Sequence, residues 1–225
     1  MILKDQRLLT CAALVKGNFV CDVGTDHGYL PAYLITSGKC SRAIACDINP
    51  LPLSAAKATA EREGIYHKVS LILSDGLKSV PTENVTDIVI AGMGGELIYR
   101  IISEDNRLRE NNINLILQPM TRAEYLRRAL AEGGFETDSE VICRQGKFLY
   151  TVIRCRYTGK PSVLQPTDEH LGKIDLSLPL SAEYARFQAQ RLKKAAVGLS
   201  SSNPEKSEEL TKIINLITEK IEGNI

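Results

Sequence analysis

The stretch from Phe19 to Gly28 constrains the fold of this chain more than any other part of it. An apolar run ends at Asp22, and Gly24 and Gly28 then frame a short turn before a second apolar stretch. This pattern is typical of the first β-strand of a nucleotide-binding α/β fold and its connection to a helix. Glycines in such a turn permit a ligand to approach the backbone closely, where a Cβ atom would block it.

The turn departs from the phosphate-binding fingerprint G-x-G-x-x-G, because Asp26 stands where a second close glycine is expected. A carboxylate at that position repels a pyrophosphate. It is suited to accept hydrogen bonds from the ammonium or hydroxyl groups of a zwitterionic ligand. S-adenosylmethionine (SAM), which carries a sulfonium cation and no phosphate, therefore fits the turn better than NAD does.

Strand and helix patterns alternate along the first part of the chain. An amphipathic helix is predicted over 4–16. The predicted strands are 18–23, 42–47, 69–73, 86–91 and 113–118, and the predicted helices between them are 28–37, 52–63, 95–103 and 122–132. Such alternation predicts a doubly wound, mostly parallel α/β sheet.

The pattern changes after this region. Two β-rich runs, 136–144 and 147–157, flank Gln145-Gly146 and predict an antiparallel hairpin. A mostly parallel sheet with such a hairpin at its edge is the arrangement of class I SAM-dependent methyltransferases, and ordinary dinucleotide-binding domains lack it. We therefore expect a Rossmann-like SAM-binding domain over 1–159.

The remaining residues, 160–225, are predicted to be a linker and a C-terminal α-helical hairpin. Residues 158–180 contain several prolines and little periodicity, which is typical of a linker. A helix is predicted over about 181–198, and a second helix begins with Asn203 as N-cap and Pro204 as its first residue. The connection between them is short, so we expect the two helices to pack antiparallel.

The charge balance excludes no class of partner, since the chain has 28 basic and 27 acidic residues. A nucleic-acid-binding protein needs segregated charge rather than an excess of it. The first C-terminal helix offers such a segregated group of cations. Both a basic nucleic-acid-binding face and an ordinary solvated face are compatible with it. The residues concerned are Arg186, Arg191, Lys193 and Lys194.

The cysteines and the N-terminus indicate where the protein acts. The six cysteines include no C-x-x-C pair and have no histidine nearby at ligand spacing, so we expect no metal site and a reducing compartment. Lys4, Asp5 and Arg7 precede only a short apolar stretch, which fits neither a signal peptide nor a membrane span. We expect a soluble, cytoplasmic protein without a membrane partner, and we favour a monomer.

Carboxylates follow three successive predicted strands, at Asp22, Asp47 and Asp75. Parallel strands end at the edge of the sheet where such folds bind ligands. Asp47 is placed to accept hydrogen bonds from the ribose hydroxyls of an adenosine. Asp75 is placed to accept a hydrogen bond from the amino group of its adenine. Each aspartate alone is equally compatible with a helix cap or a turn, but their joint occurrence favours a nucleoside site. The predicted cofactor-binding residues are Asp22, Gly24, Thr25, Asp26, Gly28, Asp47, Ile48, Asn49, Ser74, Asp75, Gly76, Leu77, Ala91 and Gly92.

Four strings resemble a known family. They are D-V-G-T-D-H-G-Y-L-P from Asp22, D-I-N-P from Asp47, A-G-M-G-G from Ala91 and L-Q-P-M from Leu117. Together they resemble the bacterial tRNA (adenine-22-N(1))-methyltransferases, the TrmK family, and the likeness covers essentially the whole chain. The resemblance implies that SAM is the methyl donor, with S-adenosylhomocysteine as product, and that the acceptor is ring nitrogen 1 of adenine 22 in the D-arm of a tRNA. It also implies that the C-terminal helices help to hold the tRNA.

We place the chemistry near the first and fourth strand ends. His27 would either orient the substrate, act as a base or cap the following helix. Tyr29 would either stack on the target base or be a packing residue of the first helix. The backbone carbonyl groups of Gly92 or Met93 would accept from the target amino group. Ring nitrogen 1 of adenine already has a free lone pair, so positioning matters more than a general base. The predicted catalytic residues are Asp26, His27, Tyr29, Gly92 and Met93, and the predicted substrate-binding residues are Tyr29, Gln118, Pro119, Arg186, Arg191, Lys193 and Lys194.

Two other functions remain open from the sequence. One is a SAM-dependent methyltransferase that acts on another RNA, a protein or a small molecule. The other is a non-catalytic RNA-binding protein that retains a SAM pocket. No Asn/Asp-Pro-Pro-Tyr motif follows the fourth strand, which argues against methylation of the adenine amino group.

Overall fold

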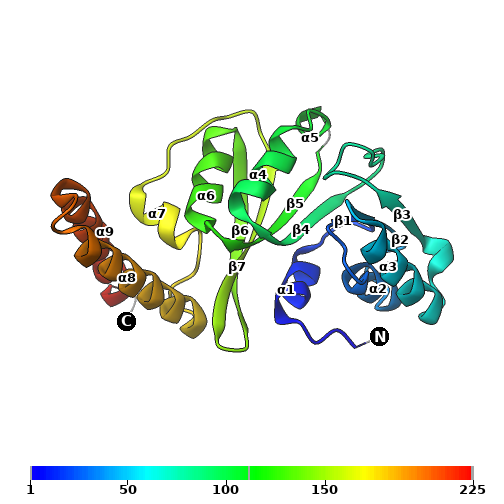
Figure 1. Cartoon of the computed structure of the whole chain (residues 1–225), viewed down its shortest axis with the longest axis horizontal. Helices are drawn as coiled ribbons and strands as arrows, with labels where there is room; N and C mark the ends of the chain where they lie inside the picture. Colours follow the sequence, from blue (N-terminus) through cyan, green and yellow to red (C-terminus); the bar gives the residue numbers. More distant parts are fainter. Residues whose placement is uncertain (1, 111, 224–225) are drawn as a thin grey trace.

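A single mixed sheet with helices on both faces forms the body of the molecule, and two long helices lie to one side of it (Figure 1). The computed structural model describes residues 2–110 and 112–223; residues 1, 111, 224 and 225, which fall within the two predicted domains, lie outside the described part. The strands are β1 (Phe19–Val23), β2 (Arg42–Asp47), β3 (Val69–Leu73), β4 (Asp87–Gly94), β5 (Asn114–Thr121), β6 (Phe135–Gln145) and β7 (Phe148–Tyr157).

The sheet has seven strands in the order β3-β2-β1-β4-β5-β7-β6. Strands β1 to β5 are parallel, whereas β7 runs antiparallel to both β5 and β6. The order in which successive strands are added to the sheet reverses between β1 and β4. Open α/β sheets bind their ligands at such a point. The class I methyltransferase arrangement that the sequence predicts is therefore confirmed.

The apolar runs of the central strands are buried on both faces, as expected for a parallel sheet between helical layers. In β4, Ile88 and Ile90 pack into one apolar cluster and Val89 packs into the other. The first cluster lies under α4 (Gly95–Ser103), α5 (Arg107–Glu110) and α6 (Ala123–Glu132). The second lies under α1 (Gln6–Leu14), α2 (Tyr29–Thr36) and α3 (Pro50–Arg62).

The C-terminal helices α8 (Pro179–Leu199) and α9 (Pro204–Glu222) form an antiparallel hairpin with an apolar cluster of its own. The side chain of Asn203 accepts a hydrogen bond from the backbone N–H of Lys206, so the predicted N-cap is confirmed. Leu192 of α8 packs against Ile213 and Ile217 of α9 in this cluster.

The segment predicted as a linker is partly helical, which corrects that prediction. Residues Pro166–Leu171 form α7, and the 3-10 turn η1 (Tyr66–Lys68) and α5 were also not predicted. These elements are too short to show a hydrophobic period. In α7 the guanidinium of Arg127 donates to the backbone carbonyl groups of Glu169 (2.8 Å) and His170 (3.0 Å), so a residue distant in sequence stabilises the end of this helix.

Candidate functional site

A cavity of about 570 Å³ lies at the carboxyl ends of β1 and β4. It joins residues from four separate parts of the chain, including most of the residues predicted near the first and fourth strand ends. Its lining comprises Ile2, Leu3, Lys4, Asp5, Arg7, Leu8, Asp22, Gly24, Thr25, Asp26, His27, Tyr29, Leu30, Ala91, Gly92 and Gln118.

The β1–α2 turn takes its shape from backbone bonds to the neighbouring strand. The N–H groups of Gly24 (2.9 Å) and Thr25 (3.0 Å) both donate to the carbonyl of Cys46 in β2. Asp26 has a φ of 50°, a left-handed conformation that non-glycine residues rarely adopt. Gly28 has a φ of +67°, and a Cβ there would lie 2.8 Å from the Cβ of Ala56 in α3. Gly28 therefore permits helix packing behind the cavity and does not line it.

Asp22 is a buried carboxyl group on the cavity wall without a cation as partner in the described part of the chain. Its Oδ2 accepts a hydrogen bond of 2.7 Å from the hydroxyl of Thr25. Burial raises the pKa of Asp22 to about 7; the Thr25 bond opposes this shift and the charge of Asp47 adds to it. A cationic ligand group beside Asp22 would supply the charge that the protein does not.

His27 and Tyr29 form an aromatic pair at the same cavity. Their ring centroids are 5.2 Å apart and the rings are nearly parallel, at 12°. The imidazole Nε2 lies 3.6 Å from Oδ1 of the exposed Asp26 side chain. Tyr29 is 41% exposed although it begins a buried helix, so its ring is available to a ligand and does not serve only to pack the helix.

The end of β4 is irregular where it meets the cavity. The register with β5 shifts between Ala91 and Met93, and Gly92 has a φ of +81°. Such bulges redirect the chain next to many active sites. Gln118, which is fully buried, accepts a hydrogen bond of 3.1 Å from the Gly92 N–H. The amide of Gln118 thus holds the β4 bulge in place.

Other predicted residues in this region lie behind the cavity. A Cβ on Gly24 would overlap the terminal methyl of Met93, which therefore packs over the turn and is not among the lining residues. Pro119 is buried beside Met93 in the β4–β5 pairing and also does not line the cavity.

The residues predicted at the end of β2 lie beside the cavity, not in its lining. Oδ1 of Asp47 accepts a hydrogen bond of 2.9 Å from the backbone N–H of Asn49. Asn49 is the N-cap residue of α3 without a side-chain capping bond, and Ile48 is 61% exposed. The charge of Asp47 nevertheless raises the pKa of Asp22, as described above, so the two strand ends are electrostatically coupled.

The loop after β3 presents backbone donors. The Asp75 carboxylate forms an exposed ion pair of 2.6 Å with Lys78, and the Ser74 hydroxyl accepts a hydrogen bond of 3.0 Å from the Ser79 N–H. Leu77 packs into the core. The N–H groups of Asp75, Gly76 and Leu77 donate to no acceptor within the described residues. The backbone of this loop is thus better placed than the paired carboxylate to meet a ring nitrogen.

The contribution of the N-terminal segment was not predicted from the sequence. Ile2–Asp5, Arg7 and Leu8 line the cavity, and among them Arg7 is held by two bonds to Asp5, of 3.1 Å from Nε and 2.6 Å from Nη2. The same guanidinium lies 5.6 Å from the ring centroid of Tyr150. The only early signal was the charge of Lys4, Asp5 and Arg7 ahead of an apolar helix.

The four predicted cations of α8 differ in their surroundings. Arg191 forms an ion pair of 3.3 Å with Glu124 of α6. Arg186, Lys193 and Lys194 are exposed, and none of them has an ion-pair partner among residues 2–110 and 112–223. Arg191 therefore joins the helix to the sheet domain, and the other three cations face solvent.

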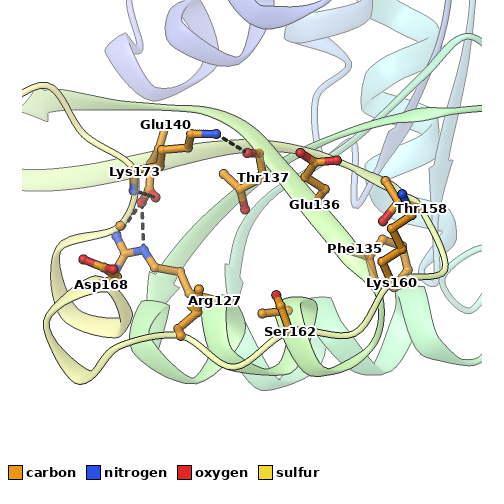
Figure 2. Close-up of a pocket in the computed structure, with 13 residues that line it drawn as sticks. Arg127, Phe135, Glu136, Thr137, Glu140, Thr158, Lys160, Ser162, Asp168 and Lys173 are labelled. Carbon is orange, nitrogen blue, oxygen red and sulfur yellow. Dashed lines mark hydrogen bonds and ion pairs between the residues drawn. The ribbon is translucent and has the colours of Figure 1, made fainter.

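A second cavity, of about 660 Å³, lies between α6, β6 and the chain that leads to α8 (Figure 2). The ion pair of Arg127 and Glu140 forms part of its wall, and the Nζ of Lys173 donates to the carbonyl of Thr137 (3.2 Å) beside it. None of the residues at the ends of β1 to β4 lines this cavity. Arg127 and the backbone N–H of Lys173 both donate to Glu140 here, which is typical of a structural junction.

Two negative findings apply to the described residues. No group of three or more His, Cys, Asp or Glu side chains within them is arranged to hold a metal ion. No helix within them combines the length and apolar character that crossing a membrane requires.

Comparison with known proteins identifies the family of the chain. Residues 4–153 match a family described as a methyltransferase domain. The chain is 34% identical over 150 residues to the tRNA (adenine(22)-N(1))-methyltransferase of Bacillus subtilis, a match that covers 66% of this chain and 63% of that protein.

Solved structures extend the similarity to the C-terminal helices. The crystal structure of a Streptococcus pneumoniae protein, a putative tRNA (m1A22) methyltransferase, is 32% identical, with a TM-score of 0.85 over 98% of this chain and 100% of that one. A structure of the same protein in complex with S-adenosyl-L-methionine has a TM-score of 0.78 at the same identity and coverage. The chain belongs to the methyltransferase domain family and, within it, to the TrmK family.

Proposed function

We propose that this protein transfers the methyl group of SAM to ring nitrogen 1 of adenine 22 in the D-arm of tRNA. The observation that carries the proposal is the cavity at the ends of β1 and β4, where a buried carboxylate without a cation faces the same space as an arginine and an exposed aromatic pair. When bound, SAM supplies an electrophilic methyl group on a positively charged sulfur.

The two ends of the amino-acid part of SAM need opposite charges from the protein. Asp22 is suited to accept hydrogen bonds from the ammonium group, since its own partner is a neutral hydroxyl. Arg7 is suited to bind the carboxylate, because its guanidinium lines the same cavity. Asp26 adds a second acceptor on the turn. These residues, rather than a phosphate-binding loop, make the cavity specific for a zwitterion.

The nucleoside would extend along the strand ends from this cavity. Asp47 is placed to accept the ribose hydroxyl groups, with Ile48 and Asn49 beside it. The unpaired backbone N–H groups of Asp75, Gly76 and Leu77 suit the adenine ring.

The target base would be held by stacking and by its edge. The Tyr29 ring, backed by His27 at a centroid distance of 5.2 Å, offers a flat surface on which an extruded adenine can stack. The β4 bulge presents backbone carbonyl groups near Gly92, and Gln118 fixes that bulge. Ring nitrogen 1 carries a lone pair, so this arrangement needs orientation and no group to remove a proton beforehand.

The tRNA body would contact the C-terminal hairpin. Arg186, Lys193 and Lys194 are exposed on α8 without ion-pair partners in the described part of the chain, so their charges are available to phosphates. We assign residues 1–159 to SAM binding and residues 160–225 to holding the tRNA. We propose a cytoplasmic monomer that needs no metal ion.

The test is incubation of the protein with labelled SAM and unmodified tRNA, followed by reverse transcription. We expect label in the tRNA and a single reverse-transcription stop at adenine 22, because methylation at ring nitrogen 1 blocks base pairing. A tRNA with guanine at position 22 is the matched control and should stay unlabelled. Label without a stop at that position, or label only in protein, would replace this proposal by one of the other methyltransferase functions.

A further inference from the structure

We propose that the tip of the β6–β7 hairpin, formed by Lys147 and Phe148, is an RNA contact that stacks on a nucleotide next to the extruded target adenine. This inference rests on the proposed function and adds to it a contact surface outside the methyl-donor cavity and outside the C-terminal helices. It starts from an exposed aromatic side chain for which the fold has no structural use.

Phe148 is 55% exposed, whereas the residues that follow it on the same face of β7 become progressively buried. Side chains alternate along a strand, so Phe148, Tyr150 and Val152 share one face. Val152 is fully buried in the cluster under α1, and Tyr150 packs partly against that cluster. Phe148 therefore lies where β7 extends beyond the end of α1 into solvent.

A series of contacts connects this exposed ring to the methyl-donor cavity. The Phe148 and Tyr150 rings are 6.4 Å apart between centroids, and the guanidinium of Arg7 lies 5.6 Å from the Tyr150 ring. Arg7 lines the cavity. The hairpin is also fixed to α1 directly, because the Gln145 side chain accepts a hydrogen bond of 2.8 Å from the Gln6 N–H.

The hairpin of β6 and β7 lies between α1, which contributes Arg7 and Leu8 to the cavity lining, and the C-terminal helix α8 (Figure 1). Arg144 forms an ion pair with Glu183 of α8, so the same strand that contacts α1 through Gln145 also contacts the hairpin of helices. An RNA that reaches from the exposed cations of α8 to the cavity therefore passes this tip.

The chemistry of the tip favours RNA over a protein partner. The Nζ of Lys147 lies 5.4 Å from the centroid of the Phe148 ring, which combines a flat apolar surface with a positive charge. Bases stack on such rings whatever their sequence, and the ammonium can meet a phosphate. Extrusion of adenine 22 removes a stacking partner from its neighbours, and an exposed ring nearby can replace that partner.

The experiment compares Phe148→Ala with a matched variant at the opposite edge of the sheet. Tyr66 in η1 is also an exposed aromatic residue, with Lys57 Nζ 5.6 Å from its ring centroid, but it is not among the residues that line the cavity. We expect Phe148→Ala to weaken the affinity for unmodified tRNA about five- to a hundredfold by fluorescence anisotropy. Tyr66→Ala should bind tRNA as the unaltered protein does. Phe148→Trp should also keep the affinity of the unaltered protein, because it retains an aromatic ring.

Further readouts separate this inference from the alternatives. Calorimetry should give Phe148→Ala an unchanged affinity for SAM, which excludes damage to the cavity. Equal tRNA affinity for Phe148→Ala and the unaltered protein would overturn the inference while methylation of adenine 22 still supports the proposed function. Sedimentation that shows a dimer lost on Phe148→Ala would also overturn it, since a second copy would then cover the tip. Failure of the unaltered protein to methylate tRNA would overturn both.

Discussion

Two buried carboxylates in this molecule have opposite surroundings, Glu140 in β6 and Asp22 at the end of β1. Glu140 accepts a hydrogen bond of 2.9 Å from Nε of Arg127, a hydrogen bond from the Thr151 hydroxyl and one of 3.0 Å from the Lys173 N–H. Arg127 also binds Tyr184 of α8, with 3.2 Å between Nη2 and the phenol oxygen. The charges of Arg127 and Glu140 therefore compensate each other within the chain.

Within the described residues, the Asp22 carboxylate accepts a side-chain hydrogen bond only from the Thr25 hydroxyl, and its burial is accordingly unfavourable for the ionised form. The comparison separates two uses of a buried acid. The Glu140 carboxylate joins parts of the fold, whereas we propose that the Asp22 carboxylate, which has no cation beside it in the described part of the chain, meets a cationic ligand group. Substitutions should therefore affect stability at Glu140 and affinity at Asp22.

The largest effect is expected from Glu140→Ala. Removal of one partner of a buried ion pair leaves Arg127 charged and uncompensated, so we expect the free energy of unfolding to fall by about 3–5 kcal/mol. Chemical denaturation measures this change. The double variant Arg127→Met/Glu140→Leu should recover much of the loss, because it removes both charges. A single variant as stable as the unaltered protein would contradict the assignment of this pair as a structural junction.

Asp22→Asn should show the opposite pattern. It keeps the size of the side chain but removes the charge that would bind the ammonium of SAM, an interaction of about 1.5–3 kcal/mol for a charged hydrogen bond. Calorimetry should therefore show SAM affinity reduced about 10- to 100-fold. Thermal unfolding without ligand should be unchanged or slightly improved, since a buried charge is removed. Unchanged SAM affinity would remove Asp22 from the site.

Much of this comparison could be predicted from the sequence, because it depends on the strands. The predicted strands 42–47 and 69–73 and the predicted helix 95–103 coincide with β2, β3 and α4. The local apolar pattern of each strand predicts that the strand is buried. The ends of the predicted strands then give the positions of the carboxylates. The turn from Gly24 to Gly28 could likewise be predicted, because its positive φ angles favour glycine.

The partners of the charged groups could not be predicted, because they come from distant parts of the chain. Arg127 stabilises the end of α7 and pairs with Glu140, contacts that no local period reveals. Arg7 reaches the cavity only because α1 packs beside β6 and β7. Arg191 was grouped with the free cations of α8, but the fold places Glu124 beside it.

The pH dependence of SAM binding should follow Asp22. In the folded, ligand-free protein the pKa of Asp22 is raised from 3.8 to about 7, chiefly by burial, so the contribution of this group to stability is present below pH 3.8 and is lost as pH rises through about 7. Binding of an ammonium requires the ionised form, so affinity changes in the opposite sense. We expect affinity to increase roughly fivefold from pH 6 to pH 7, a range in which an α-amino group with a pKa of about 7.7–8.0 is still mostly protonated.

Calorimetry across this pH range measures the increase, and binding near pH 6.5 should release protons to the buffer. His27 also lines the cavity, so His27→Gln is the control and should retain the pH dependence, whereas Asp22→Asn should lose it. A pH dependence that disappears with His27→Gln and persists in Asp22→Asn would assign the titration to the imidazole instead.

The smallest effects extend the same comparison from acids to bases, on α8. Lys193 is exposed and has no ion-pair partner in the described part of the chain, so it corresponds to Asp22. Arg191 is paired with Glu124, so it corresponds to Glu140, which is paired with Arg127. If an unpaired charge indicates a ligand contact, Lys193→Ala should weaken tRNA binding a few-fold and lower the slope of log affinity against log salt by about 1. Arg191→Ala should leave that slope nearly unchanged, because its charge is already compensated. Titrations at several salt concentrations distinguish the two variants, and equal slopes would show that pairing in the free protein does not determine which cations meet the phosphates.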